Sequence, residues 1–243
     1  MSADSETSVQ VEMPLIGQIL RSPIKAGKLL VFLFDPDSLW SMLLLNIVAG
    51  LLQKGIDALY VVTSRRVTDV RDDFRRLGLD TGPYERDERL CLSDAFTFKT
   101  GRPSSEKYHF ETLNVADVSI MSSKSLDQWP PGSVRIFENV SEVAETTDEK
   151  NFLKFHRTWT SRLVTTGRIA IDGFLRGVHT DSLYNSVMSY ADAVFELRTE
   201  EVGGKLESVL RARSFRGGPV DTSKYILRVN ESLAIHLEGA KPL

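Results

Sequence analysis

Blocks of apolar and polar residues alternate along the chain from about residue 28 onward. Residues 29–34 are a continuous apolar run, and residues 58–63 are a second run that is apolar up to its final threonine; short runs of this kind are typical of strands that are buried on both faces. A turn with two aspartates and a proline follows the first run and leads into an apolar helix over residues 39–52. After the second run, residues 68–77 carry an amphipathic helical pattern that Gly78 stops. This part of the chain therefore predicts strand, helix, strand and helix.

The later part of the chain continues this alternation and then leaves it. We predict strands at residues 90–92, 134–137, 168–171 and 193–197, a loop at 93–105, and helices at 150–163 and 182–190. Consecutive strands follow at residues 206–215, 225–229 and 233–237. Alternating strands and helices favour a parallel sheet, whereas consecutive strands with short turns favour antiparallel pairing. The predicted fold class is α/β, with a largely parallel central sheet flanked by helices and a C-terminal antiparallel hairpin.

The length of 243 residues suits one large α/β domain. Residues 1–12 are polar and lack the apolar core of a signal peptide, so we predict a flexible tail there and a single domain over residues 13–243. The most apolar stretch, residues 39–52, is shorter than the roughly 20 residues that a membrane-spanning helix needs. We therefore predict no membrane span.

Composition and charge narrow the classes of function. The chain has 30 Lys and Arg residues against 33 Asp and Glu, and its formal net charge of -3 gives no global attraction to nucleic acid or anionic lipid. Cys91 is the single cysteine and lies in an apolar run, which fits a buried thiol in a reducing compartment and predicts a cytoplasmic protein. The four histidines are far apart in the sequence, so we predict no metal site.

Several short stretches carry a resemblance to a known family. They are GKLLV at residues 27–31, ALYV at 58–61, FENVSEV at 137–143, YADAVFEL at 190–197 and RSFRG at 213–217. Together with the predicted order of elements, they resemble the KaiC/RadA-like branch of the RecA-type ATPase superfamily over nearly the whole chain. The resemblance implies a RecA-like fold with a nucleotide site at the carboxyl ends of the parallel strands. It also implies subunits that assemble side by side, often as hexameric rings.

The phosphate-binding loop of that family is altered in this chain. Such a loop uses glycines for close backbone approach, a lysine for the phosphates and a Ser or Thr hydroxyl for magnesium. The matching turn spans residues 34–41, where Pro36 and Ser41 fit the pattern but no glycine remains. Leu39 and Trp40 stand where the last glycine and the lysine belong. We therefore predict a degenerate phosphate site.

Charge in the same turn opposes phosphate binding. Asp35 and Asp37 would lie beside a triphosphate, and like charges at roughly 4 Å repel by a few kcal/mol at the effective dielectric of a protein surface. The structural alternative is that Asp35, Asp37 or Ser38 caps the free N–H groups of the helix that follows.

Three further positions of the family's site are altered or partly kept. Arg65 stands where the family has a glutamate that activates water, and a guanidinium cannot act as that base. Glu138 matches the magnesium-associated aspartate at a strand end, with a side chain one methylene longer. Arg216 remains from a Lys-x-Arg pair that contacts a neighbouring subunit's phosphate, while Ser214 replaces the lysine. We predict no catalytic residue among them and no cofactor.

These features favour a non-hydrolysing pseudo-ATPase that acts as a regulatory or assembly protein through protein partners, including itself or an active paralogue. A second hypothesis is a nucleic-acid-associated accessory subunit of a recombination, repair or RNA-modification complex. Its basis is a strip of arginines at positions 65, 66, 71, 75 and 76, although aspartates are interleaved with them. Two alternatives remain: an ATP-binding signalling protein with a divergent site, and an enzyme that uses Asp94, Glu138 and Glu142 as a relocated carboxylate site.

Overall fold

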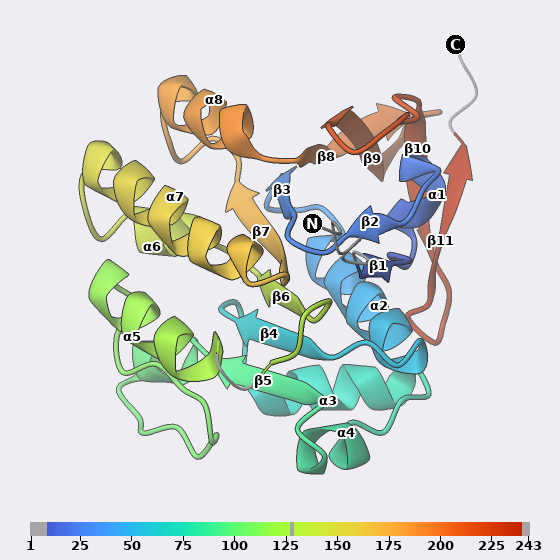
Figure 1. Ribbon diagram of the computed structural model, residues 1–243. Coiled ribbons are helices and arrows are strands. Elements are labelled where there is room, and N and C mark those ends of the chain that lie inside the picture. Colours follow the sequence, from blue (N-terminus) through green and yellow to red (C-terminus); the bar gives the residue numbers. More distant parts are fainter. Residues whose placement is uncertain (1–8, 127–128, 240–243) are drawn as a thin grey trace, which may run out of the picture.

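A nine-stranded sheet forms the centre of the computed structural model, which describes residues 9–126 and 129–239 (Figure 1). In chain order its strands are β3 (Leu29–Phe34), β4 (Ala58–Val62), β5 (Leu90–Asp94), β6 (Val134–Phe137), β7 (Ile169–Leu175), β8 (Ala193–Val202), β9 (Lys205–Phe215), β10 (Lys224–Val229) and β11 (Ile235–Gly239). Across the sheet they follow the order β11-β10-β9-β8-β3-β7-β6-β4-β5.

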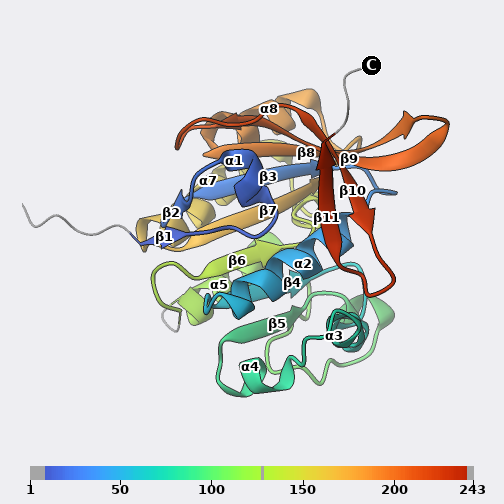
Figure 2. The same cartoon turned by 90° about the vertical axis from the view of Figure 1, so that its right-hand side faces the viewer.

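The mode of strand pairing changes once across the sheet, from parallel to antiparallel. All strands from β8 to β5 run parallel, because each is joined to the next by a crossover connection. From β8 outward, β9, β10 and β11 pair antiparallel through short turns. The β8–β9 hairpin projects beyond the rest of the molecule (Figure 2). This arrangement confirms the predicted α/β class with a largely parallel sheet and an antiparallel C-terminal edge.

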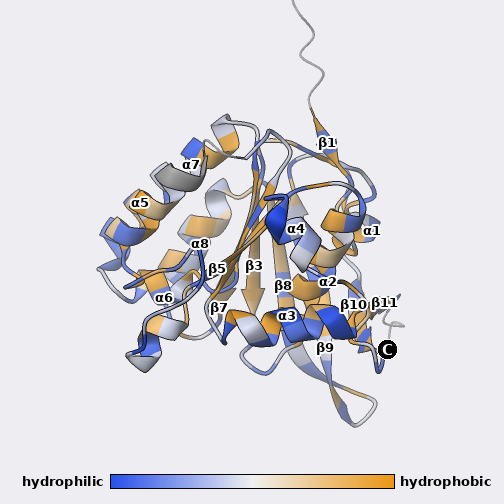
Figure 3. Ribbon diagram, turned by 90° about the horizontal axis from the view of Figure 1, so that it is seen from below, coloured by the Kyte–Doolittle hydropathy of each residue, from blue (hydrophilic) through white to orange (hydrophobic). Residues whose placement is uncertain are grey.

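Helices cover both faces of the sheet. They are α1 (Ile16–Leu20), α2 (Trp40–Gln53), α3 (Val67–Arg76), α4 (Gly82–Arg86), α5 (Val115–Leu126), α6 (Ser141–Ala144), α7 (Glu149–Thr165) and α8 (Asp181–Tyr190). Alternate residues of β3 serve the two faces: Leu30 and Phe32 belong to the apolar core under α2, and Leu29 and Val31 belong to the core under α7 and α8. Every residue of β3 is therefore buried, which explains its unbroken apolar sequence (Figure 3).

The beginning of the described chain corrects the predicted tail. Residues 1–8 lie outside the described part, but Gln10–Val11 forms strand β1 and pairs antiparallel with β2 (Ile24–Lys25). The Val11 side chain is buried in the core under α2. The prediction of a flexible tail up to residue 12 is therefore wrong for residues 10 and 11, because the β1–β2 pairing and the buried Val11 side chain hold them against the domain.

The predicted loop at residues 93–105 is also corrected in part. Strand β5 continues through Asp94, and a 3-10 turn follows at Thr97–Thr100. The short helices α4 and α6, and helix α5, were not predicted. Within the described ranges, no helix is both long and apolar enough to cross a membrane.

Candidate functional site

The turn between β3 and α2 lies at the carboxyl ends of the parallel strands, as the resemblance implies. Pro36 and Asp37 form its exposed tip. The Asp35 carboxylate accepts a hydrogen bond from the main-chain N–H of Thr199 at 3.0 Å, and Asp37 accepts one from the Thr199 hydroxyl at 2.8 Å. Arg176, the residue after β7, places its guanidinium 3.2 Å from Asp35. The aspartates therefore tie the turn to β8, and the Asp35 charge is partly offset by Arg176.

The predicted helix cap at this turn is wrong. Leu39 is the N-cap residue of α2, and no side chain caps it. The Ser38 hydroxyl donates to the Asp35 carbonyl oxygen at 2.6 Å, and the Leu39 N–H donates to the Ser208 hydroxyl of β9 at 2.9 Å. Both aspartates accept hydrogen bonds from Thr199 and do not cap the helix. The free N–H group at the start of α2 therefore bonds to β9, a strand distant in the sequence, and not to a side chain of its own turn.

Trp40, at the lysine position of the family's loop, is part of the core. Its indole is 3% exposed and stacks on Phe34, with ring centroids 5.1 Å apart and planes at 13°. Its Nε1–H donates to the main-chain carbonyl of Glu138 at 2.8 Å. A Cβ atom at Gly173 would lie 2.6 Å from the indole, so glycine is needed there for this close approach. The indole thus occupies the space between β3, β6 and β7.

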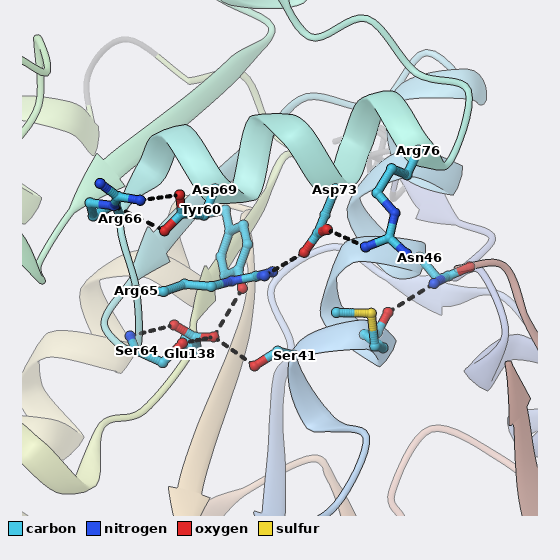
Figure 4. Close-up of polar contacts among 11 residues, drawn as sticks. Ser41, Asn46, Tyr60, Ser64, Arg65, Arg66, Asp69, Asp73, Arg76 and Glu138 are labelled. Atoms are coloured by element: carbon cyan, nitrogen blue, oxygen red, sulfur yellow. Dashed lines mark hydrogen bonds and ion pairs between the residues drawn. The ribbon is translucent and has the colours of Figure 1, made fainter. Parts of the chain in front are cut away.

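Glu138, which follows β6, is the polar centre of the site. Its side chain accepts hydrogen bonds from Ser41 Oγ (3.1 Å), Tyr60 OH (3.2 Å), Ser64 Oγ (2.9 Å), Thr63 N (2.7 Å) and Ser64 N (3.0 Å) (Figure 4). Burial raises the pKa of Tyr60, and the nearby Glu138 charge raises it further, so this hydroxyl stays protonated and donates. The buried carboxylate is therefore stabilised by neutral donors.

The family's magnesium chemistry does not fit this arrangement. Each Glu138 oxygen already accepts at least two hydrogen bonds, which fills the lone-pair sites of a carboxylate. A cation would reach Glu138 only by displacing Ser41, Tyr60 or the loop after β4. The hydroxyl and carboxylate positions of the family still meet here, but they bind each other.

The Arg65 side chain is directed away from Glu138 and toward helix α3. It forms an ion pair with Asp73, which also lies 3.3 Å from Arg76 (Figure 4). The prediction that Arg65 replaces a catalytic carboxylate is compatible with this position, since its side chain starts directly beside the Ser64 that binds Glu138. Its charge, however, is used to hold α3 against β4.

The structure separates Arg216 from the other predicted residues. Its main-chain N–H donates to Asp192 at 2.7 Å, and its guanidinium contacts the Ser189 carbonyl at the end of α8. Phe215, the neighbour of Arg216, pairs with Ala193 at the start of β8. The phosphate turn follows Phe34, which pairs with Leu197 at the other end of the part of β8 that runs parallel to β3. Within one chain Arg216 therefore lies at the opposite end of β8 from the phosphate turn, and its contact with a neighbouring subunit's phosphate stays a prediction.

The carboxylates of the relocated-site hypothesis have separate partners. Asp94 accepts hydrogen bonds from two main-chain N–H groups and from Ser104 Oγ at 2.7 Å; burial would raise its pKa, but these bonds outweigh burial and lower it. Glu142 pairs with Lys99, whose ammonium also donates to the Thr63 carbonyl at 2.7 Å. No group of three or more metal-binding side chains lies together in the described ranges.

The arginine strip of the nucleic-acid hypothesis is neutralised. Its ion pairs join Arg65 to Asp73, Arg66 to Asp69, Arg71 to Glu85 and Glu106, Arg75 to Asp72, and Arg76 to Asp73. The aspartates in these pairs belong to α3 itself, and the two glutamates that pair with Arg71 belong to α4 and to the loop after β5. Little net positive charge is left on this face for a phosphate backbone.

Three residues of the site carried no signal in the sequence. Arg176 and Thr199 follow or lie within strands far from residues 34–41, and Lys99 belongs to a segment predicted as loop. The sheet order brings Arg176 and Thr199 to the turn, since β3 lies between β7 and β8, whereas Lys99 contacts the loop after β4 at the Thr63 carbonyl. No sequence spacing shows such neighbours.

Comparison with known proteins places this geometry in context. The crystal structure of the KaiC-like protein PH0186 from Pyrococcus horikoshii OT3 is similar, with a TM-score of 0.73, 14% sequence identity, and coverage of 95% of this chain and 98% of that one. At this identity the likeness shows the KaiC-like, RecA-type fold alone. No curated protein matches the sequence. A family model described as a family of unknown function (DUF7125) matches residues 15–238, and the chain belongs to that family.

Proposed function

We propose that this chain is a non-hydrolysing RecA/KaiC-like domain, a pseudo-ATPase that acts through contacts with other proteins. The observation that carries the proposal is the buried Trp40 indole. A side chain that is stacked on Phe34 and bonded to the Glu138 carbonyl cannot extend to a β- or γ-phosphate. An indole also offers one N–H donor and no positive charge.

The state of Glu138 supports the same proposal. A carboxylate with a full set of donors stabilises the junction of β4, β6 and α2, which is a structural role. An ATP-binding signalling role would require Trp40 to leave its stack and Ser41 to leave Glu138. An accessory role on nucleic acid has less support, because the α3 arginines are paired with carboxylates.

A cytoplasmic location also belongs to this proposal. Its support is Cys91, a buried free thiol whose pKa is raised by burial, which suits a reducing compartment.

The test is phosphate release from MgATP by the full chain, measured beside its Ser41→Ala and Glu138→Gln variants. The proposal expects release at the buffer level, or a trace that is equal in all three proteins and so comes from a contaminant. Turnover near the roughly 1–10³ s⁻¹ of ordinary enzymes that falls in both variants would refute it.

A further inference from the structure

Helices α5 and α7 lie on the face of the sheet away from α2 (Figures 1 and 3). The side chains of these two helices line a groove. We call it the α5–α7 groove; its volume is about 260 Å³. Its lining includes Ser119, Ser122, Lys154, Phe155, Trp159 and Arg162. The volume is below the roughly 300–1,000 Å³ of sites for small organic ligands, and is suited to one bulky side chain.

The floor of the groove is aromatic and rigid. Phe155 and Trp159 stack with centroids 5.6 Å apart and planes at 12°, and the Arg135 guanidinium lies 4.1 Å from the Trp159 ring centroid. The Trp159 Nε1–H donates to Ser122 Oγ at 2.5 Å, which joins α7 to α5. Because Phe155 and Arg135 cover the Trp159 ring, no nucleobase can stack on it. An apolar side chain can still pack on the exposed part of Phe155.

A buried ion pair fixes this floor to the sheet. Arg135 of β6 pairs with Asp172 of β7, and His156 Nε2 lies 3.1 Å from the same carboxylate. The Asp172 and His156 side chains are fully buried. The groove therefore exists before any partner arrives, and binding loses little conformational freedom in the floor.

The rim of the groove is positively charged. Lys154 and Arg162 are exposed and have no acidic partner among the residues that the structure describes. The rest of α7 adds Lys150 and Arg157 against a single glutamate at its start. This contrasts with α3, where each arginine is paired, and it gives a local basic surface on a chain of net charge -3.

We propose that the α5–α7 groove binds an acidic segment of a partner protein, with one bulky apolar side chain against Phe155 and carboxylates beside Lys154 and Arg162. Charge complementarity selects the acidic partner, and the apolar floor supplies the anchor. With the Trp159 ring covered, only part of Phe155 is left for stacking, and this favours a peptide over single-stranded nucleic acid, which stacks successive bases on several aromatic rings. The inference rests on the proposed function and names the surface through which it acts.

The experiment selects ligands for the full chain from a random-peptide phage library. The best peptide is then synthesised with a fluorescein label and titrated by fluorescence anisotropy. We expect enriched sequences that combine a bulky apolar residue with Asp or Glu, and an affinity that falls as salt rises. A Lys154→Glu/Arg162→Glu variant should bind at least about tenfold more weakly, which corresponds to roughly 1.4 kcal/mol.

The matched control is a Lys205→Glu/Arg102→Glu variant, which makes the same charge change at exposed cations away from the groove and should bind within about twofold of wild type. Circular dichroism checks that both variants fold. Lack of enrichment, enriched sequences without acidic residues, or equal loss in both variants would overturn the proposal. The proposal would also be overturned if a labelled single-stranded oligonucleotide bound the wild-type protein and did not bind the Lys154→Glu/Arg162→Glu variant. None of these outcomes bears on MgATP turnover, so the proposed function is tested separately.

Discussion

The indole N–H of Trp40 donates to the main-chain carbonyl of Glu138 at 2.8 Å. In the family that the chain resembles, these two positions carry the lysine of the phosphate loop and the magnesium-associated carboxylate. Here they are joined directly, and the Ser41 hydroxyl joins the same carboxylate from α2. The positions that the resemblance assigns to nucleotide binding therefore contact each other and form a structural junction.

Removing the Trp40 side chain should destabilise the fold. Trp40→Ala leaves a cavity beside Phe34 and Gly173, and we expect it to lower the free energy of unfolding by about 3–5 kcal/mol in urea titrations. Trp40→Phe keeps an aromatic ring and should lose less. Trp40→Lys should also be destabilised and should gain no ATP binding. A Trp40→Ala protein within about 1 kcal/mol of wild type would contradict the role given to the indole.

Neutralising Glu138 should cost more stability than neutralising a nearby exposed carboxylate. Glu138→Gln places an amide against the donating N–H groups of Thr63 and Ser64, so we expect a loss of about 2–3 kcal/mol by urea denaturation. Glu142→Gln removes a partly exposed pair with Lys99 and should change stability by less than about 1 kcal/mol. Equal effects of the two substitutions would show that Glu138 is not the centre of the junction.

The buried Asp172 should make the free energy of unfolding depend on pH. Burial would raise its pKa, but Arg135 and His156 outweigh burial and hold it below the usual value. The unfolded carboxyl titrates near 3.9, so the unfolded chain binds the proton more readily. The stabilisation is complete above roughly pH 5 and is lost as pH falls through the lower, folded pKa.

Asp172→Asn should therefore flatten the acid limb of the stability curve. At neutral pH it leaves Arg135 buried without its counter-charge, and we expect a loss of about 3–5 kcal/mol. Urea titrations between about pH 3 and pH 7 measure both effects. Asp87→Asn, at an exposed position, is the control and should stay within about 0.5 kcal/mol of wild type. An unchanged acid limb in Asp172→Asn would exclude Asp172 as its source.

Arg71 should hold the segment after β5 in place. Its guanidinium pairs with Glu85 of α4 at 2.7 Å and with Glu106 at 2.6 Å, which links three parts of the chain. In Arg71→Ala, limited proteolysis should cut around residues 101–107 several-fold faster, because opening of that segment costs less free energy. Arg75→Ala, which removes only an exposed pair within α3, should leave the cleavage rate unchanged. Equal rates in both variants would contradict the link.

Much of the fold follows from apolar runs in the sequence. The predicted strand at residues 134–137 coincides with β6, and the run at 29–34 coincides with β3. The predicted strand at 168–171 stops early, because Asp172 breaks the apolar pattern although β7 continues to Leu175. The strand tolerates this charge only because Arg135 neutralises it from β6, and no local pattern reveals that partner.

The candidate site was less predictable than the fold. The resemblance predicts a degenerate phosphate loop with Trp40 at the lysine position, but the burial of the indole depends on Gly173, more than a hundred residues away in the sequence. The roles of Asp35 and Asp37 were misassigned as helix caps, since Thr199 reaches them only through the pairing of β3 with β8. Long-range strand order decides these contacts, and residue spacing does not encode it.

The central claim is that Trp40 and Glu138 close the nucleotide crevice, and calorimetric titration of the full chain with MgATP tests it most directly. The account predicts no saturable heat up to about 1 mM nucleotide, a binding free energy weaker than roughly -4 kcal/mol. Saturable binding with a dissociation constant near 10 μM or tighter, weakened in Ser41→Ala, would contradict it.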